Sequence, residues 1–427
     1  MRFAAFFLVI LVVLAALGLY VHRRASGLLG LGQRGRRVLA GVLAAGAVAM
    51  IAARMGRGAL PDGVLRGLGI TGSVVSLSIV ISAVLLAVVD LGRLLAWSGR
   101  AALARAGAGG RAADGGTRAA DGAREEPGAP GPALAPREPA PMPPALPRRA
   151  FLAHGAAGSA FLIGSGSSIY GALLGRHDYV IEEIAIPIPG LPRSLDGFSI
   201  VQLSDIHLGL FVGEPEMRAA EDLVRKARAD LIVMTGDLID HDPRYAEHLG
   251  RLTRRLGPLA REGVAAIPGN HDHFAGIGQA LDALQRGGAH VLRNRGRVVG
   301  DAGGAFALLG VDDVWAARMR LPGGGPDLAR AIADVPRDLP RVLLCHNPVF
   351  FPEAAGEVAL QLSGHTHGGQ VNLVVRPADL VLPYGYVAGL YQRGGSHLYI
   401  NRGFGTAGPP ARIGAPPEVS RIVLVAA

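Results

Sequence analysis

Long apolar runs fill the first part of the chain, whereas short apolar runs alternate with polar segments in the rest. Residues 3–21 and 68–89 contain no charged side chain, and about 20 apolar residues suffice for a helix to cross a bilayer core. Residues 38–53 form a shorter run between Arg37 and Arg54, whose side chains can reach the interfaces. A buried core helix would need a polar face, which these runs lack. We predict three spanning helices within a transmembrane region of residues 1–98.

The next part of the chain changes composition twice. Residues 99–149 are rich in Ala, Gly, Pro and Arg, which bury too little surface to offset chain entropy, so we predict a disordered linker. Residues 150–175 then contain no Asp, Glu, Lys or Arg. Because they follow Arg148 and Arg149 directly, they fit either a fourth spanning helix or a segment that resembles a twin-arginine export signal, here internal. Both interpretations place the arginines inside and the downstream chain outside.

The arginines give the expected orientation. Cytoplasmic loops carry an excess of Lys and Arg, and both the loop of residues 22–37 and the linker are rich in arginine. Four spanning segments with an external N-terminus place both of these inside. We therefore expect a multi-pass protein of the cell membrane whose domain of residues 177–427 is extracytoplasmic.

Residues 177–427 show a repeating pattern of strand and helix. Apolar runs at 198–203, 231–234 and 264–267 are typical of buried strands, and residues 214–229 and 245–261 between them have helical periodicity. This alternation predicts an α/β domain with a largely parallel sheet. In such sheets, functional residues gather just beyond the carboxyl ends of strands.

Polar residues follow five of the predicted strands. The motifs are SDIH, GDLID and GNHD after the first three strands, and HNP and GHTHGGQ after apolar runs at 342–345 and 360–362. Any one of these motifs occurs often by chance. Mixed Asp, His and Asn ligands without thiolate suit a two-metal hydrolytic centre better than a structural zinc site. No HExxH motif is present, so a protease of that class is not supported.

The ordered set of motifs resembles the calcineurin-like metallophosphoesterase superfamily. The longer phrases SDIHLG, TGDLID, IPGNHD and LSGHTHGGQ are similar to its membrane-anchored bacterial branch, whose relatives are called transmembrane proteins with a metallophosphoesterase domain. The resemblance covers about residues 179–427. It implies a four-layer α/β sandwich, with two sheets between layers of helices, following the transmembrane region.

The resemblance also implies a set of site residues and two metal ions, which would be Mn, Fe or Zn. His271 matches the proposed general acid of the family, and Asp240 either orients its imidazole or caps the following helix. The implied chemistry is attack on phosphorus by a hydroxide that bridges the two ions. One metal is assigned to Asp205, His207 and His367, the second to Asn270, His346 and His365, and Asp237 bridges the two.

Composition narrows the possible partners. The net charge of +9 would favour nucleic acid if the basic residues lay on the folded domain. Residues 1–176 instead hold 19 Arg against 7 Asp and Glu, whereas residues 177–427 hold 24 Lys and Arg against 27 Asp and Glu. The positive charge therefore belongs to the membrane region, and we expect lipid and a phosphoester as partners, with no nucleic acid. Cys345 is the single cysteine, which excludes an intramolecular disulfide.

Three functions are open at this point. The first is a phosphodiesterase or pyrophosphatase acting on a lipid-linked or nucleotide-sugar substrate, for which the resembling branch offers hydrolysis of UDP-2,3-diacylglucosamine. An external domain would, however, face away from a cytoplasmic UDP-sugar. The second is a phosphomonoesterase of the protein phosphatase kind, and the third is a non-catalytic membrane scaffold or sensor. The complete set of ligand types favours an enzyme.

Overall fold

The computed structural model describes residues 2–56, 58–108, 148–321 and 323–427. The chain divides into two compact units, one of residues 1–41 with 78–165 and the other of 42–77 with 166–427. In the first unit, the carboxylate of Asp90 accepts hydrogen bonds from Arg24 Nη2 at 2.6 Å and from the Tyr20 hydroxyl at 2.7 Å. These contacts partner a charged side chain within a strongly apolar segment.

Four of the described helices are long and apolar enough to cross a membrane. The predicted segments at 3–21, 38–53, 68–89 and 150–175 fall almost wholly within them. The third helix continues to Ala108 and the fourth begins at Arg148, so the first ten and the last two residues of the predicted linker are helical. Residues 109–147 of that linker lie outside the described residues. The helices are α1 (Arg2–Leu28), α2 (Gln33–Met55), α3 (Asp62–Ala108) and α4 (Arg148–Leu173).

The first sheet of the α/β domain has six strands in the order β1-β12-β2-β3-β4-β5. The four strands β2 to β5 are parallel, as the alternating pattern predicts, but β12 runs antiparallel to β2. The sheet is therefore mixed. Its strands are β1 (Val180–Ile188), β2 (Ser199–Leu203), β3 (Leu231–Thr235), β4 (Val264–Ile267), β5 (His290–Val291) and β12 (Glu418–Ala426).

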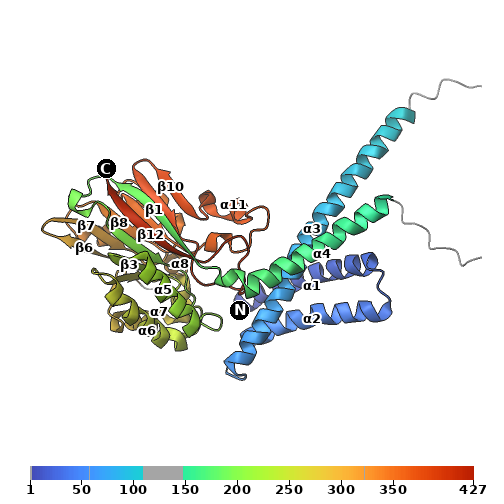
Figure 1. Cartoon of the computed structure of the whole chain (residues 1–427), viewed down its shortest axis with the longest axis horizontal. Coiled ribbons are helices and arrows are strands. Elements are labelled where there is room, and N and C mark those ends of the chain that lie inside the picture. Colours follow the sequence, from blue (N-terminus) through green and yellow to red (C-terminus); the bar gives the residue numbers. More distant parts are fainter. Residues whose placement is uncertain (1, 57, 109–147, 322) are drawn as a thin grey trace, which may run out of the picture. The chain divides into compact units, whose positions relative to one another are not determined.

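The second sheet also has six strands, in the order β10-β11-β9-β8-β7-β6. Its four central strands are parallel, and an antiparallel strand closes each edge. Figure 1 shows the strands of the two sheets side by side, with α5, α6 and α7 against the first sheet. The strands are β6 (Arg295–Asp301), β7 (Gly304–Gly310), β8 (Arg341–Leu344), β9 (Leu360–Ser363), β10 (Gly389–Arg393) and β11 (Ser396–Ile400).

Alternate residues of the central strands face different layers. In β2, Val201 and Leu203 pack against the helices, whereas Ile200 packs against the second sheet. A second set of helices covers the outer face of the second sheet through Leu309 and Leu343. Both faces of each sheet are covered, so the central strands carry buried apolar side chains on both faces, and the four-layer α/β sandwich is confirmed. The domain's helices are α5 (Glu214–Ala227), α6 (Ala246–Leu256), α7 (Asn270–Arg286), α8 (Val314–Arg318), α9 (Leu328–Ala333), α10 (Phe351–Ala354) and α11 (Ala378–Val381).

Local sequence explains where the helices that flank the site begin. Glu216, at the third position of α5, accepts a hydrogen bond from the backbone N–H of Gly213 at 2.8 Å. Asp272 has the same role in α7, where its Oδ2 accepts from Gly269 N at 2.8 Å. Carboxylates in a first turn satisfy free N–H groups and suit the positive end of the helix dipole. Each helix therefore begins at a fixed residue directly after a site loop.

The core between the two sheets offers a test of the fold. Phe306 is fully buried, and its ring lies edge-on to that of Phe198 with centroids 5.3 Å apart. We expect Phe306→Ala to destabilise the domain by about 3–5 kcal/mol through loss of burial and a residual cavity. This corresponds to a melting midpoint lower by about 10 °C for a domain of this size. Val298→Ala, at a 42% exposed position on β6, is the matched control. Equal shifts in the two variants would contradict the packing described here.

Candidate metal centre

The candidate site lies where the carboxyl ends of five strands come together. Strands β2, β3 and β4 of the first sheet and β8 and β9 of the second each end within one residue of one of the polar motifs. Backbone hydrogen bonds fix the loops to one another, since Asp205 N donates to Gly236 O and His207 N to Asp237 O, both at 3.0 Å. Gly364 N donates to His346 O at 3.0 Å and joins the two loops of the second sheet.

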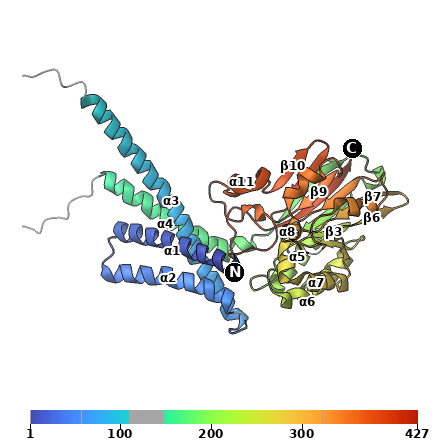
Figure 2. The same ribbon diagram turned by 180° about the vertical axis from the view of Figure 1, so that it is seen from behind.

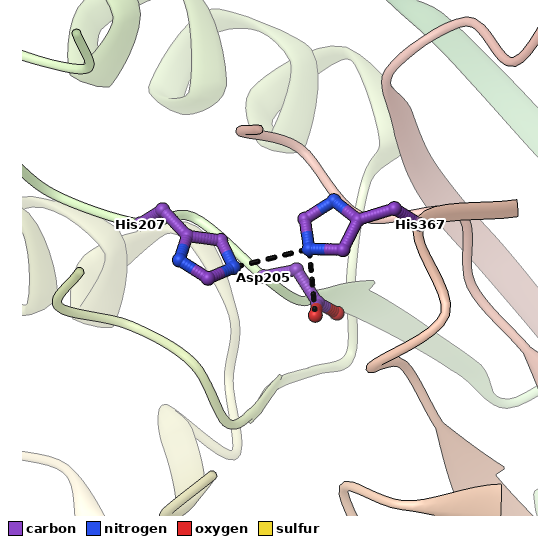
Figure 3. A group of neighbouring side chains, drawn as sticks. All are labelled: Asp205, His207 and His367. Atoms are coloured by element: carbon purple, nitrogen blue, oxygen red, sulfur yellow. Dashed lines mark hydrogen bonds and ion pairs between the residues drawn. The ribbon is translucent and has the colours of Figure 1, made fainter. Parts of the chain in front are cut away.

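One group of side chains combines the first and last motifs. The ligand atoms of Asp205, His207 and His367 all lie within 4.8 Å of one another, and all three residues are buried. Figure 3 shows the two imidazoles pointing toward each other, with Nε2 atoms 3.0 Å apart, and His367 Nε2 lies 3.4 Å from Asp205 Oδ1. Two ring nitrogens and a carboxylate oxygen that converge in this way can hold one cation.

A second group is built around Asp237. Its Oδ2 lies 3.3 Å from His346 Nε2 and 3.7 Å from His207 Nε2, so this oxygen faces both halves of the site. Its Oδ1 accepts a hydrogen bond from the backbone N–H of His271 at 2.7 Å. The ligand atoms of Asp237, His346 and His365 also lie within 4.8 Å of one another. Asp237 thus belongs to the second group and also faces His207 of the first.

Asn270 supplies a separate indication that a cation fits here. It is 8% exposed, and its Oδ1 is a buried atom with no hydrogen-bond partner among the described residues. An unpaired buried amide oxygen costs free energy. A bound metal ion would be a partner for that oxygen, so Asn270 fits the proposed set of metal ligands.

The backbone is strained at the same residues. Of the ten non-glycine residues with positive φ in the described chain, five belong to the candidate ligand set. Residues other than glycine rarely adopt positive φ angles, and backbone strain of this kind is concentrated at functional sites. Their φ angles lie between 51° and 72°, and the residues are Asp205, His207, Asp237, His365 and His367.

Glycine is needed beside Asp237 for a related reason. Gly236 has a φ of 88°, and a Cβ added to it would lie 2.8 Å from His346 Nδ1.

The hydrogen bond of His346 fixes its tautomer. Its Nδ1 lies 2.8 Å from the carbonyl oxygen of Thr235. Because a carbonyl can only accept, Nδ1 carries the proton and Nε2 is turned toward Asp237.

The carboxylate of Asp237 is stabilised in its charged form. Burial alone would raise its pKa, but the imidazoles of His346 and His271 hold the pKa of Asp237 well below its ordinary value. Burial and the neighbouring His346 together lower the pKa of His365 to about 3. His365 is therefore neutral near pH 7, which is the form of imidazole that binds a metal.

His271 lies beside these groups. Its Nδ1 is 2.9 Å from the backbone oxygen of Asp240 and 3.3 Å from the Asp240 carboxylate. Burial alone would lower the pKa of His271, but Asp237 and Asp240 raise it to about 9. Asp240 does not cap the next helix, because Asp242 does so by accepting from Arg244 N at 3.0 Å. The capping alternative for Asp240 is therefore wrong.

Two residues near the site, His241 and Arg412, were not identified from the sequence, because they lie outside the spacing of the motifs. His241 Nδ1 lies 2.8 Å from Asp240 Oδ1, so this carboxylate faces a further imidazole. Arg412 is 1% exposed, and its Nη2 lies 3.1 Å from His367 Nδ1. A fully buried arginine is rare unless it is paired, and burial lowers the pKa of Arg412 to about 10. Its polar surroundings come from backbone oxygens, which no sequence motif marks.

Comparison with known proteins identifies the family. The model for calcineurin-like phosphoesterases matches residues 198–369, which include all of the predicted site residues. An uncharacterised metallophosphoesterase, YkuE of Bacillus subtilis, is 34% identical over 287 residues, which cover 65% of this chain and 97% of the relative. The chain belongs to the calcineurin-like phosphoesterase family. It is a metallophosphoesterase, a metal-dependent hydrolase, and the resemblance drawn from its motifs is confirmed.

The names of other relatives mention a transmembrane protein or an activity. A transmembrane protein with metallophosphoesterase domain from Danio rerio is 32% identical to this metallophosphoesterase and covers 62% of it. The chain spans 62% of that relative. The phosphodiesterase YaeI of Escherichia coli is 33% identical, over 53% of the chain and 82% of the relative.

Solved structures match this chain only at low identity among those compared. The 5'-nucleotidase precursor of Thermus thermophilus matches 53% of this chain and 54% of its own, at 16% identity and a TM-score of 0.34. A likeness at this level says nothing about the substrate of the metallophosphoesterase.

Two substitutions separate the ligand set from the neighbouring histidine. We expect Asp237→Asn to weaken metal binding on the order of 100-fold or more, because it removes the charge opposite several buried histidines. Turnover should be nearly abolished. His271→Ala should retain metal and lower turnover by about 10²-fold to 10⁴-fold, as expected for loss of a general acid. Metal content per purified full-length chain, measured by mass spectrometry after dialysis, distinguishes the two variants. Loss of metal from His271→Ala would make His271 a ligand.

Proposed function

We propose that the chain is a membrane-anchored phosphodiesterase that uses two metal ions. The first ion is assigned to Asp205, His207 and His367, and the second to His346 and two further residues. Asp237 is assigned to both ions. The identity of the ions is Mn, Fe or Zn, which accept this mixture of nitrogen and oxygen ligands. The remaining ligands of the second ion are Asn270 and His365.

The observation that carries this proposal is the position of Asp237. Its Oδ2 faces an imidazole of each group, at 3.3 and 3.7 Å, while its Oδ1 is held by a backbone N–H. A carboxylate oxygen so placed suits a bridging ligand. If only one ion were bound, one of the two groups of buried histidines would have no cation to bind.

The residues around the ions have separate tasks. Bound cations would supply charge to the phosphoryl oxygens and lower the pKa of an attacking water. His271 holds a proton that can pass to the leaving oxygen, because its pKa is raised to about 9. Since its Nδ1 lies against the backbone oxygen of Asp240, Nε2 is the atom available for that transfer. Asp240 acts as a positioning residue that fixes the ring.

Support for a diester as substrate comes from a relative and from the membrane region. The relative from Escherichia coli is named a phosphodiesterase, and the described part of the chain has four helices apolar enough to span a membrane. A lipid-linked phosphodiester or pyrophosphate suits both facts. An extracytoplasmic site disfavours UDP-2,3-diacylglucosamine, because a cytoplasmic UDP-sugar would lie on the other side of the membrane.

The orientation with an extracytoplasmic domain gains support from contacts within the second unit. Arg66, near the start of α3, donates from Nε to the backbone oxygen of Leu210 at 2.9 Å. Gly171, at the end of α4, accepts from Arg412 N at 3.0 Å. Both the start of α3 and the end of α4 therefore contact the metallophosphoesterase domain. The arginine-rich linker joins the other ends of these two helices, namely the end of α3 and the start of α4. If both helices span the membrane, the linker and the domain lie on opposite sides, and the arginines place the linker inside.

The reaction class is tested on soluble substrates. We expect the purified full-length chain, supplied with Mn²⁺, to hydrolyse bis-p-nitrophenyl phosphate at least about tenfold faster, in kcat/KM, than p-nitrophenyl phosphate. A preference of this size corresponds to about 1.4 kcal/mol of transition-state binding. Release of p-nitrophenol measures both rates. The opposite preference would favour a phosphomonoesterase, and a metal-loaded protein inert toward both would favour a scaffold or sensor.

The orientation is tested with fused reporters. An enzyme that becomes active only after export is expected to be active when it is fused after Ala427 and inactive when it is fused after Leu31. The second position lies between α1 and α2, in the first arginine-rich loop. The reverse pattern of activity would place the metallophosphoesterase domain in the cytoplasm.

A further inference from the structure

A loop of exposed apolar side chains follows the last candidate ligand. We call residues 371–386 the apolar loop; it lies between His367 and β10 and contains α11. Val374 is 93% exposed and Leu380 is 86% exposed. Exposure of this extent in a contiguous segment marks an interaction surface. The exposed apolar side chains of the loop are Leu373, Val374, Val375, Leu380, Val381 and Tyr384.

This concentration is specific to the loop. Among the described residues from 177 onward, ten large apolar side chains are exposed, and six of them belong to the apolar loop. The other four are between 37% and 47% exposed. Scattered apolar residues on a surface need no explanation, so the loop stands apart from the rest of the domain.

The base of the loop lies beside the end of α4. Asn372 N donates to Ile413 O at 2.7 Å, and Ile413 N donates to Gln370 O at 2.9 Å. The residue before Ile413 donates its backbone N–H to Gly171 O in the last turn of α4, at 3.0 Å. A Cβ at Gly171 would lie only 2.6 Å from Ile413 Cγ1, so the glycine permits this approach. With each hydrogen-bonded link about 5 Å wide, the loop begins roughly 10 Å from the backbone of α4.

The helix that ends there is a candidate membrane span. Residues 154–177 have the length and composition to cross a bilayer. The end of a spanning helix lies at the interface between lipid and water, where an amphipathic segment buries its apolar side chains about 5–10 Å deep. Tyr384 suits this region, because aromatic rings with a polar atom are enriched at membrane interfaces. A bilayer therefore matches both the chemistry and the position of the loop.

Both ends of the loop are tied to the candidate metal centre. Asn372 Nδ2 donates to Gly368 O at 2.9 Å, one residue after His367. At the other end, the hydroxyl of Thr366 donates to Val387 O. The residues that flank His367 therefore hold both ends of the apolar loop, and a loop seated in lipid would bring this side of the centre to the membrane surface.

We infer that the apolar loop inserts into the bilayer interface beside α4 and presents the metal centre to the headgroup of a lipid phosphodiester. This inference rests on the membrane anchoring and hydrolysis proposed above, and it deepens them by naming the substrate class. In the reaction, a water oxygen bonds to phosphorus and the bond from phosphorus to one ester oxygen breaks. The departing oxygen takes a proton from His271, and the water gives up one proton to the solvent, from which His271 regains its own, so the products are a phosphomonoester and an alcohol.

Insertion is tested with a fluorescent probe on the full-length chain in vesicles of phosphatidylethanolamine and phosphatidylglycerol. Cys345 can remain, because it is fully buried and burial raises the pKa of its thiol well above the ordinary value. A polarity-sensitive dye on Val374→Cys is expected to be quenched at least twofold by lipids that carry a nitroxide near the headgroup. It should also be shielded from aqueous iodide.

Val298→Cys is the matched control. Val298 is an exposed valine on β6, and in both views of the structure β6 lies at the end of the domain opposite to α11 (Figures 1 and 2). The dye at this position should respond to iodide and not to the nitroxide lipids. If the dye on Val374→Cys behaved in the same way, the inference would be overturned. A dye shielded from iodide but insensitive to nitroxide would also overturn it, because a protein would then cover the loop.

The substrate class is tested with two forms of one headgroup. Dioleoyl phosphatidylglycerol is held in vesicles, whereas dihexanoyl phosphatidylglycerol is presented as monomers. We expect Val374→Asp with Val375→Asp to lower hydrolysis of the vesicle lipid at least tenfold and to change hydrolysis of the monomeric lipid and of bis-p-nitrophenyl phosphate less than twofold. Val298→Asp should change none of the three. Equal rates for wild type and the double variant on vesicles, or a wild type that cleaves only the aryl diester, would overturn the inference. Failure to cleave any diester would instead overturn the proposed function.

Discussion

The buried negative charge of Asp237 is the constraint on which the site depends. A carboxylate removed from water is costly unless charges and hydrogen bonds compensate it. Here His346 and His207 face one oxygen, and the backbone N–H of His271 binds the other. These three residues come from loops after β8, β2 and β4, so compensating the one charge requires both sheets to end at the same place. The four-layer packing and the site are therefore parts of a single arrangement.

The central strands and the ligand types were open to prediction from sequence because they follow local rules. Runs such as LIVM at 231–234 are apolar on both faces, which indicates a covered parallel strand, and the polar residue after each run lies at its carboxyl end. Strands β1 and β12 were not predicted. The exposed positions of β1 do not alternate regularly with buried ones, β12 is buried or half-buried along its whole length, and the pairing of β12 with β2 joins segments more than 200 residues apart. Such pairing depends on tertiary packing, which no short pattern records.

The same distinction holds within the site. Histidine and aspartate could be chosen as candidates from the motifs, but the polar network around them could not. Arg412 is linked to His367 across 45 residues, and its other partners are backbone oxygens of a loop near Gly403. The positive φ angles of Asp205 and Asp237 are also set by the meeting of loops from different strands. Strain of this kind persists only when the surrounding structure over-determines it, so it follows from the whole domain rather than from nearby sequence.

The end of α4, a candidate membrane span, is connected to the candidate metal centre through one buried side chain. Arg412 donates its backbone N–H to Gly171 in α4, while its guanidinium contacts His367 and the carbonyl of Gly405. A guanidinium that is 1% exposed cannot shift without leaving several acceptors unpaired, which would cost the desolvation free energy of each. The end of α4 and the candidate ligand are thus joined by a stiff contact. If α4 is the membrane anchor proposed above, a centre tied in this way would keep its distance from the bilayer, which suits a substrate whose phosphate also lies at a fixed depth.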